Sequence, residues 1–184
     1  MEEITIRPAR PGDARRIARL DVETWRAAYA GILTTPFLVG LSERRRELGW
    51  ATVIEREPRD VRVAVDGDGN IRGFGSCGRC RAGAAMAGEV YTLYVAPDWQ
   101  NQGIGRRLLV ALFERLVAQG CGSAIIWVLS DNPGRFFYHR LGGREVRRRV
   151  LAVGGMRVEA AGYAWQDLPR FLETAARADR APEA

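Results

Sequence analysis

Lysine is absent from this sequence, and histidine and cysteine are rare. Its 184 residues contain one histidine, His139, and three cysteines, Cys77, Cys80 and Cys121, and all 28 basic side chains are arginine. A Walker A phosphate loop is excluded, because its G-x-x-x-x-G-K-[ST] sequence requires a lysine. Three cysteines cannot form a disulfide framework, and zinc held by Cys77 and Cys80 would need both Cys121 and His139. We therefore expect no metal site.

Long apolar runs are also missing. No stretch of the chain is apolar for long enough to span a bilayer, and the first ten residues, MEEITIRPAR, lack the apolar segment of a signal peptide. The sequence therefore predicts a cytoplasmic protein with no membrane partner.

Charge of one sign dominates. The net charge is +6 and the isoelectric point is near 9.9. An excess of arginine suits an anionic partner, either a nucleic acid or a phosphorylated small molecule. Acidic residues are interleaved through most of the chain, and Val146–Val150 (VRRRV) is typical of an exposed strand with solvated charges. We favour a compositional bias toward arginine together with a small anionic ligand, and expect no nucleic-acid partner.

Hydrophobic periodicity predicts an α/β (α+β) chain with the order β-αα-βββ-α-β-α-ββ. We interpret residues 1–184 as one domain, with residues 168–184 as a loose helical tail. The predicted strands lie at 4–9, in a hairpin over 60–78, at 88–97 and 123–130, and in a last hairpin over 144–165. The predicted helices span 10–33, 42–58, 105–119 and 132–143.

The stretch Tyr94–Leu109 (YVAPDWQNQGIGRRLL) begins as a strand and ends as a helix. Gly103 and Gly105 allow backbone conformations that larger residues resist and leave room for a ligand. The first helical turn has N–H groups without helical partners, which predict, with the helix dipole, Arg106 and Arg107, a cradle for phosphate. The third glycine of a dinucleotide fingerprint is missing, and G-x-G alone also fits a plain strand-to-helix turn.

In its context, this turn resembles the acetyl-CoA motif of the GNAT superfamily of N-acetyltransferases. The motif Q-x-x-G-x-G covers Gln100–Gly105 and is followed by an amphipathic helix. The resemblance covers most of the chain, and the family's mixed, mostly antiparallel central sheet flanked by helices has the same element order. Ile4–Leu20 resembles the family's first strand and helix, Trp25–Leu33 a segment of one bacterial branch, Asn132–Gly143 the second conserved motif and Gly154–Trp165 the closing strand.

The resemblance implies that acetyl-CoA is a cosubstrate. Its pyrophosphate would lie on the amides from Gln102 to Arg106, and its pantetheine arm would pair with the strand edge at Tyr94 and Val95. Tyr138 follows Asn132 by six residues, one fewer than in the commonest version of the second motif. The implied cofactor-binding residues are Tyr94, Val95, Gln100, Asn101, Gln102, Gly103, Ile104, Gly105, Arg106, Asn132 and Tyr138.

Acetyl transfer to an amine needs a base, because an amine with a pKa near 10 is protonated at neutral pH and cannot attack. Glu89 matches a position that often carries this base in relatives; alternatively it is an exposed carboxylate where a strand begins. The Val95 N–H is the candidate for stabilising the oxyanion. Tyr138 resembles the general acid that protonates the thiolate; alternatively it is a core aromatic beside Phe136 and Phe137.

The acceptor pocket has four aromatic candidates, each of which also suits a core position. These residues are Trp25, Tyr29, Tyr91 and Trp127. A covalent cysteine mechanism would need an imidazole partner, and His139 is the only one in the sequence. This mechanism is disfavoured, because His139 neighbours Tyr138 on a helix and points about 100° away from it.

We therefore expect an acetyl-CoA-dependent N-acetyltransferase that acts through a ternary complex on a primary amine of a small molecule or peptide. The competing hypotheses are a non-catalytic acyl-CoA-binding or regulatory module with the same fold, and an arginine-rich nucleic-acid binder. Polyamine, amino acid, antibiotic and protein N-terminus all stay open as acceptors. A homodimer is expected through a strand edge at Gly154, Gly155 and Met156–Trp165.

Overall fold

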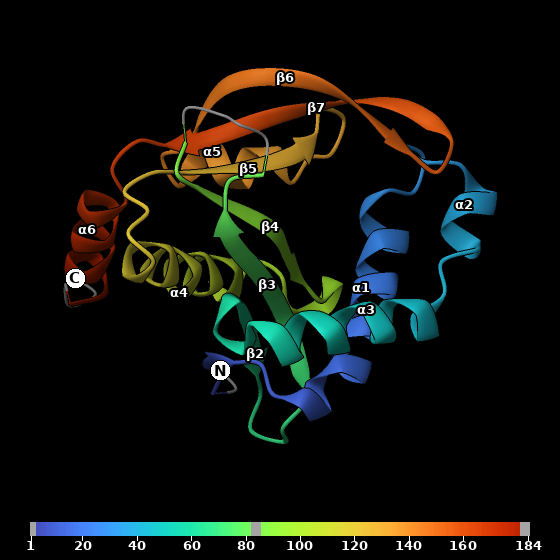
Figure 1. Cartoon of the computed structure of the whole chain (residues 1–184), viewed down its shortest axis with the longest axis horizontal. Coiled ribbons are helices and arrows are strands. Elements are labelled where there is room, and N and C mark those ends of the chain that lie inside the picture. The colour runs from blue at the N-terminus through green and yellow to red at the C-terminus, as the bar shows by residue number, and fades with distance from the viewer. Residues whose placement is uncertain (1–2, 82–85, 181–184) are drawn as a thin grey trace.

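The computed structural model describes residues 3–81 and 86–180, and its centre is a seven-stranded sheet (Figure 1). The strands are β1 (Thr5–Pro8), β2 (Val61–Val65), β3 (Ile71–Arg79), β4 (Gly88–Val95), β5 (Ala124–Leu129), β6 (Arg144–Val153) and β7 (Met156–Trp165). The helices are α1 (Ala14–Ala28), α2 (Thr35–Val39), α3 (Glu43–Arg56), α4 (Ile104–Ala118), α5 (Arg135–Arg140) and α6 (Leu168–Arg180), with short 3-10 turns at Pro11–Asp13, Pro58–Asp60 and Pro97–Trp99.

The sheet is mixed and mostly antiparallel, which confirms the predicted fold class. Its strand order is β1-β2-β3-β4-β5-β7-β6, and only the β4–β5 pair is parallel. The long β6–β7 hairpin arches over β5 at one end of the molecule (Figure 1). No helix of the described ranges is long and apolar enough to cross a membrane.

Strands β4 and β5 separate halfway along their length. They pair only at Gly88–Ala124, Glu89–Ile125 and Val90–Ile126. Directly after Val90, the register of β4 against β3 shifts by one residue, so that Tyr91 is the extra residue of a β-bulge. The bulge bends β4 away from β5, and the two strands diverge beyond this point (Figure 1).

Helix α4 covers one face of the sheet with the apolar stripe that the sequence predicted. Its leucines and Phe113 are fully buried; they are Leu108, Leu109, Leu112 and Leu116. Two strand glycines permit the close approach, because a Cβ at Gly75 would lie 2.7 Å from Leu112 Cδ1, and one at Gly73 would lie 3.0 Å from Leu108 Cδ1. Overpacking of this kind costs about 1–3 kcal/mol, so these glycines fix the depth of α4 on the sheet.

Helices α1 and α3 cover the opposite face. Ile17 of α1 and Ile54 of α3 pack with Val63 and Phe74 of the sheet. Asp21 ties the two helices together, because its Oδ2 accepts from Trp50 Nε1 at 2.9 Å and from Arg46 Nη1 at 3.2 Å. Burial raises the pKa of the Asp21 carboxyl, which these two donors oppose. This network holds α1 in the position from which it reaches the cleft.

The C-terminal segment was predicted to be a loose helix, and its described part is a helix that packs against α4 and β7. Helix α6 begins at Leu168, which is fully buried. The Phe171 ring centroid lies 5.1 Å from that of Phe113 and 6.4 Å from that of Trp165. Aromatic contacts therefore fix α6 against α4 and β7, and residues 181–184 of the predicted tail lie outside the described residues.

Two predictions, one about a helix boundary and one about the sheet edge, need correction. The predicted helix over 10–33 ends at Ala28, because the chain turns at Gly31 (φ +78°), and the unpredicted helix α2 follows. The strand Met156–Trp165 was proposed as an edge, but β7 pairs with β5 on one side and with β6 on the other. Strand β6 is the edge at this end of the sheet.

Candidate functional site

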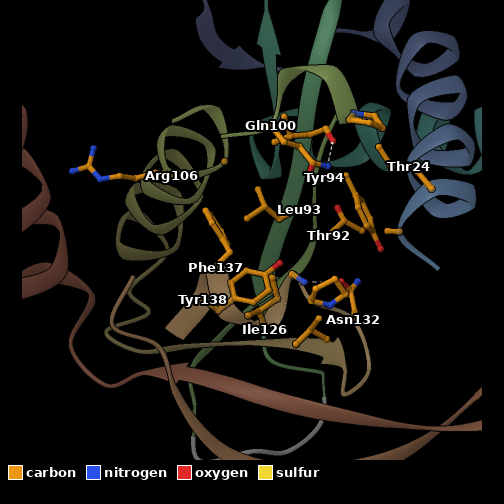
Figure 2. A pocket seen from close by; sticks show the side chains of 18 of the residues that line it. Thr24, Thr92, Leu93, Tyr94, Gln100, Arg106, Ile126, Asn132, Phe137 and Tyr138 are labelled. Carbon is orange, nitrogen blue, oxygen red and sulfur yellow. Dashed lines mark hydrogen bonds between the residues drawn. The ribbon is translucent and has the colours of Figure 1, made fainter. Parts of the chain in front are cut away.

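A cleft of about 680 Å³ occupies the gap between the diverging ends of β4 and β5. Its walls also include the last turn of α1, the turn before α4 and the start of α5. Figure 2 shows side chains from these elements converging on the cleft, among them Thr24, Tyr94, Asn132 and Tyr138.

The turn before α4 provides a helix N-terminus at one end of the cleft. Gly103 has φ +78°, a left-handed conformation that a side chain would strain, and it is followed at once by the helix. Gly103 and Gly105 both border the cleft. A Cβ at Gly105 would lie 3.2 Å from Phe137 Cζ, so a larger residue would crowd the α5 side chain that covers the helix start. Backbone N–H groups and the helix dipole make this end suitable for an anion.

The arginines predicted to assist this cradle are directed elsewhere. The Arg106 side chain extends from α4 away from the other labelled side chains, and its Nη2 donates to the Ala175 carbonyl of α6 at 3.1 Å (Figure 2). Arg107 Nη2 donates to the Ile4 carbonyl at 2.8 Å. Arg106 still borders the cleft, so this end of it presents the backbone amides of the turn, the helix dipole and part of the Arg106 side chain.

The other residues of the motif divide into two groups. Gln100 and Asn101 border the cleft, and Gln100 Nε2 donates to the Val95 carbonyl at 3.2 Å. Ile104, the first residue of α4, is instead buried in the core with Leu108. The Gln102 side chain donates to the Asp98 carbonyl outside the cleft.

The edge of β4 presents a peptide group to the cleft at Val95. Ala96 N–H donates to the Arg72 carbonyl of β3 at 2.8 Å. Successive residues of a strand direct their peptide groups to opposite sides, so the Val95 N–H points away from β3 and toward β5. Because β4 and β5 pair only as far as Val90, this N–H faces the cleft that Val95 borders.

Three tyrosines and an asparagine border the cleft, namely Tyr29, Tyr94, Tyr138 and Asn132. The Tyr29 hydroxyl lies 3.2 Å from the Tyr94 hydroxyl. Burial raises the pKa of Tyr29, while its hydrogen bonds to Tyr94 and Asn132 oppose this increase. Asn132 Oδ1 also accepts from the Gly134 N–H at 2.7 Å, which orders the approach to α5.

Tyr138 lies both in the core and at the cleft, the two positions that the sequence left open. Its ring packs in the core, with its centroid 5.2 Å from that of Phe137 and 6.4 Å from that of Trp165, yet the residue also borders the cleft. In Figure 2 its hydroxyl points toward the space below Leu93. Burial raises the pKa of the Tyr138 phenol above its ordinary value, so it keeps its proton throughout the neutral range.

Glu89 is buried rather than exposed, so the alternative of an exposed carboxylate is wrong. The residue is 2% exposed, its Oε1 accepts from Arg81 Nη2 at 2.7 Å, and its Oε2 accepts from the Arg81 N–H at 3.0 Å. Both oxygens are thus bound by one residue, and Glu89 lies behind the cleft wall rather than in it.

Of the four aromatic acceptor candidates, Tyr29, Tyr91 and Trp127 border the cleft. Trp25 does not. Its ring packs against Tyr29 at 4.9 Å and against Phe37 at 6.4 Å, and the Arg46 guanidinium covers it. Trp25 is therefore part of the core that supports the wall.

The sequence missed two arginines on this side of the molecule, Arg81 and Arg149. The guanidinium of Arg149 lies 3.8 Å from the Trp127 ring centroid, although its strand had been interpreted as fully solvated. No pattern within Val146–Val150 indicates this contact, because Val146 and Val150 are 49% and 55% exposed and Trp127, which Arg149 covers, belongs to another strand.

The cysteines take no part in this site. Burial raises the pKa of the Cys77 thiol to about 12, which makes it unreactive, and Cys77, Cys80 and Cys121 are all unpaired. Within the described ranges, no group of three or more histidine, cysteine or acidic residues could hold a metal ion.

Comparison with known proteins gives one consistent family. The model of the acetyltransferase (GNAT) family matches residues 20–143. The uncharacterized N-acetyltransferase YuaI of Bacillus subtilis is 32% identical over 166 residues, which cover 90% of this chain and 94% of that protein. An L-methionine sulfoximine/L-methionine sulfone acetyltransferase of Pseudomonas aeruginosa is 32% identical over 106 residues, 57% of this chain and 62% of that one.

A solved structure has the same fold. The PaiA N-acetyltransferase of Thermoplasma acidophilum, in complex with coenzyme A, superposes with a TM-score of 0.65 at 20% identity. The match covers 86% of this chain and 98% of that one.

Proposed function

This chain belongs to the GNAT family of acetyltransferases, and from that premise we propose that it is an N-acetyltransferase. In this proposal the acetyl group moves directly from acetyl-CoA to a primary amine of a small molecule or peptide, within a ternary complex. The observation that carries the proposal is the cleft between β4 and β5, which has a helix N-terminus at one end and a buried tyrosine at its centre.

The cofactor half of the cleft suits acetyl-CoA. The pyrophosphate binds the amides at the start of α4, from Gln102 to Arg106, where the glycines leave room for it. The pantetheine arm lies along β4 and adds hydrogen bonds to Tyr94 and Val95, whose strand edge is open there. The coenzyme A complex of the PaiA protein supports the choice of cosubstrate.

The chemical step uses groups that already face the cleft. The Val95 N–H stabilises the oxyanion that forms when the amine attacks the thioester. Tyr138 then donates its proton to the thiolate of CoA as the carbon–sulfur bond breaks. A phenol of raised pKa remains protonated at neutral pH, and a thiol of pKa near 8.5 keeps the proton that it receives.

Glu89 is the proposed base. Because its carboxylate lies behind the wall and both oxygens accept from Arg81, the amine proton reaches it through water rather than by direct contact. Tyr91, two residues further along β4, borders the cleft and marks the place where this path enters it.

The proposal is tested by following thiol release from acetyl-CoA across a panel of primary amines, with CoA binding measured separately. Saturable release that depends on an amine supports it. Tight CoA binding without turnover on any amine supports the alternative, a non-catalytic acyl-CoA-binding module with the same fold.

A further inference from the structure

The part of the cleft beside Tyr91 and Trp127, which we call the acceptor half, has two arginines behind its rings that do not border the cleft themselves. The Arg149 guanidinium lies 3.8 Å from the Trp127 ring centroid, and the Arg81 guanidinium lies 3.9 Å from the Tyr91 ring centroid. Tyr91 and Trp127 themselves border the cleft, on β4 and β5. We call these four residues the arginine–aromatic wall.

The two arginines differ in how their charge is balanced. Glu89 neutralises Arg81 through an ion pair of 2.7 Å. Arg149 takes part in none of the ion pairs found among residues 3–81 and 86–180. Burial lowers the pKa of Arg149, and Arg81 lowers it further, while Glu89 opposes the change. The wall therefore carries one positive charge that lacks a counter-charge.

Hydrogen-bond donors are also unused at this place. Arg149 Nε and Trp127 Nε1 are both shielded from solvent and have no acceptor among the described residues. A sheltered donor without an acceptor is unfavourable, so two such donors on a guanidinium and a ring that contact each other indicate that a ligand completes them.

The cleft has no acidic lining. None of the described residues that border it is aspartate or glutamate, and its charged members are Arg106 and Arg140. A polyamine would therefore find no carboxylate in it for its second and third charges.

We propose that the acceptor is an amine that carries a carboxylate close to its amino group, as an amino acid does. Arg149 supplies the counter-charge, Trp127 a second donor, and the rings of Trp127 and Tyr91 flank the carbon skeleton. This inference rests on the proposed N-acetyltransferase function and names the class of its acceptor.

Matched acceptors test it. Thiol release is measured with glycine, L-methionine and L-phenylalanine, each beside its own α-carboxamide, and with spermidine. The amide has the less basic amine and so more of the reactive free form, which means that amine reactivity cannot explain a preference for the acid. The expected kcat/KM is about 10- to 100-fold higher for the preferred acid than for its amide, the range of one hydrogen bond to a charged group.

Variants of Arg149 locate the effect. Arg149→Gln should remove the preference by lowering kcat/KM for the acid alone, with the KM for acetyl-CoA unchanged, and Arg149→Lys should retain part of it. The matched control is Arg148→Gln on the same strand, since Arg148 is exposed and pairs with Glu145 and Glu159. Equal use of acid and amide by the wild type, or an equal loss for both in Arg149→Gln, would overturn the inference.

A failure of the proposed N-acetyltransferase function can be distinguished from a failure of this inference. If acetyl-CoA binds but no amine is acetylated, the proposed function fails, and the binding of carboxylate and carboxamide ligands then tests the inference. N-acetyl-L-methionine should raise the melting temperature of the CoA complex more than N-acetyl-L-methioninamide does. Equal shifts with the two compounds would overturn the inference.

Discussion

The two halves of the cleft are built by different means. The half in which we propose that acetyl-CoA binds is mostly backbone, namely the edge of β4 at Val95, the turn at Gly103 and the first amides of α4, while the Arg106 and Arg107 side chains donate to the carbonyls of Ala175 and Ile4. The acceptor half is built from side chains. Its wall combines residues from β4, β5, β6 and the segment after β3, which meet only in the folded sheet.

This difference predicts how each half responds to substitution. A backbone site depends on the room that glycine leaves and tolerates most changes around it. A side-chain site changes whenever one of its residues changes, so it can adapt to a new acceptor without disturbing the cofactor. The predictions below probe the halves in turn, beginning with the change that should remove all function.

The largest effect is expected from Gly105→Glu in the cofactor half. The new carboxylate would oppose the pyrophosphate, and its Cβ would already lie within 3.3 Å of the Phe137 ring. We expect no thermal stabilisation by acetyl-CoA and no detectable turnover, measured by differential scanning fluorimetry and thiol release.

Gly49→Glu is the matched control. It makes the same chemical change at an exposed helical glycine whose Cβ would meet no atom within 4 Å. The control should bind acetyl-CoA like the wild type. A Gly105→Glu protein that melts at the wild-type temperature and still binds CoA normally would place the phosphate site elsewhere.

The next effect is expected from Tyr138→Phe, at the junction of the two halves. The ring contacts with Phe137 and Trp165 remain, and only the proton is lost. General acid catalysis contributes about 10²- to 10⁴-fold, so kcat should fall by that factor while the affinity for acetyl-CoA stays constant.

The pH profile sharpens this prediction. Because burial raises the pKa of Tyr138, the wild type should lose no activity through its deprotonation up to about pH 10, the ordinary phenol value. Weaker CoA binding with normal turnover at saturation would make Tyr138 a ligand contact instead. No change in either quantity would leave it a core residue.

A smaller effect is expected from Glu89→Gln, behind the acceptor half. The proton transfer passes through water, so we expect a loss of about 10- to 10²-fold near neutral pH, below the range of direct acid–base catalysis. Turnover should recover in part at high pH as free amine becomes available. A pH–rate profile of unchanged shape would assign the base to another group.

The sequence could place the turn before α4 and the helix that follows it, but not the contacts between the strands, and both outcomes have the same physical reason. The motif from Gln100 to Gly105 is contiguous, and the leucine stripe of α4 is periodic, so both are visible in the chain order. The pairing of Arg149 with Trp127 depends on strand register, which periodicity alone does not give. The same limit explains why β7 was taken for an edge.

The smallest effect concerns self-association, which bears on the hairpin that carries Arg149. We predict a homodimer through β6, since β7 is paired on both sides. Val146 and Val150 are 49% and 55% exposed on this strand, which favours contact, but Arg144 and Arg147 are also exposed and would repel a second copy. Salt screens such repulsion, so the dimer dissociation constant should fall by roughly two- to fivefold between low and high ionic strength.

Sedimentation velocity at micromolar concentrations measures this dissociation constant, and the variant Val150→Asp should abolish the dimer. A monomer at every concentration and salt would show that the acceptor wall is complete within one chain.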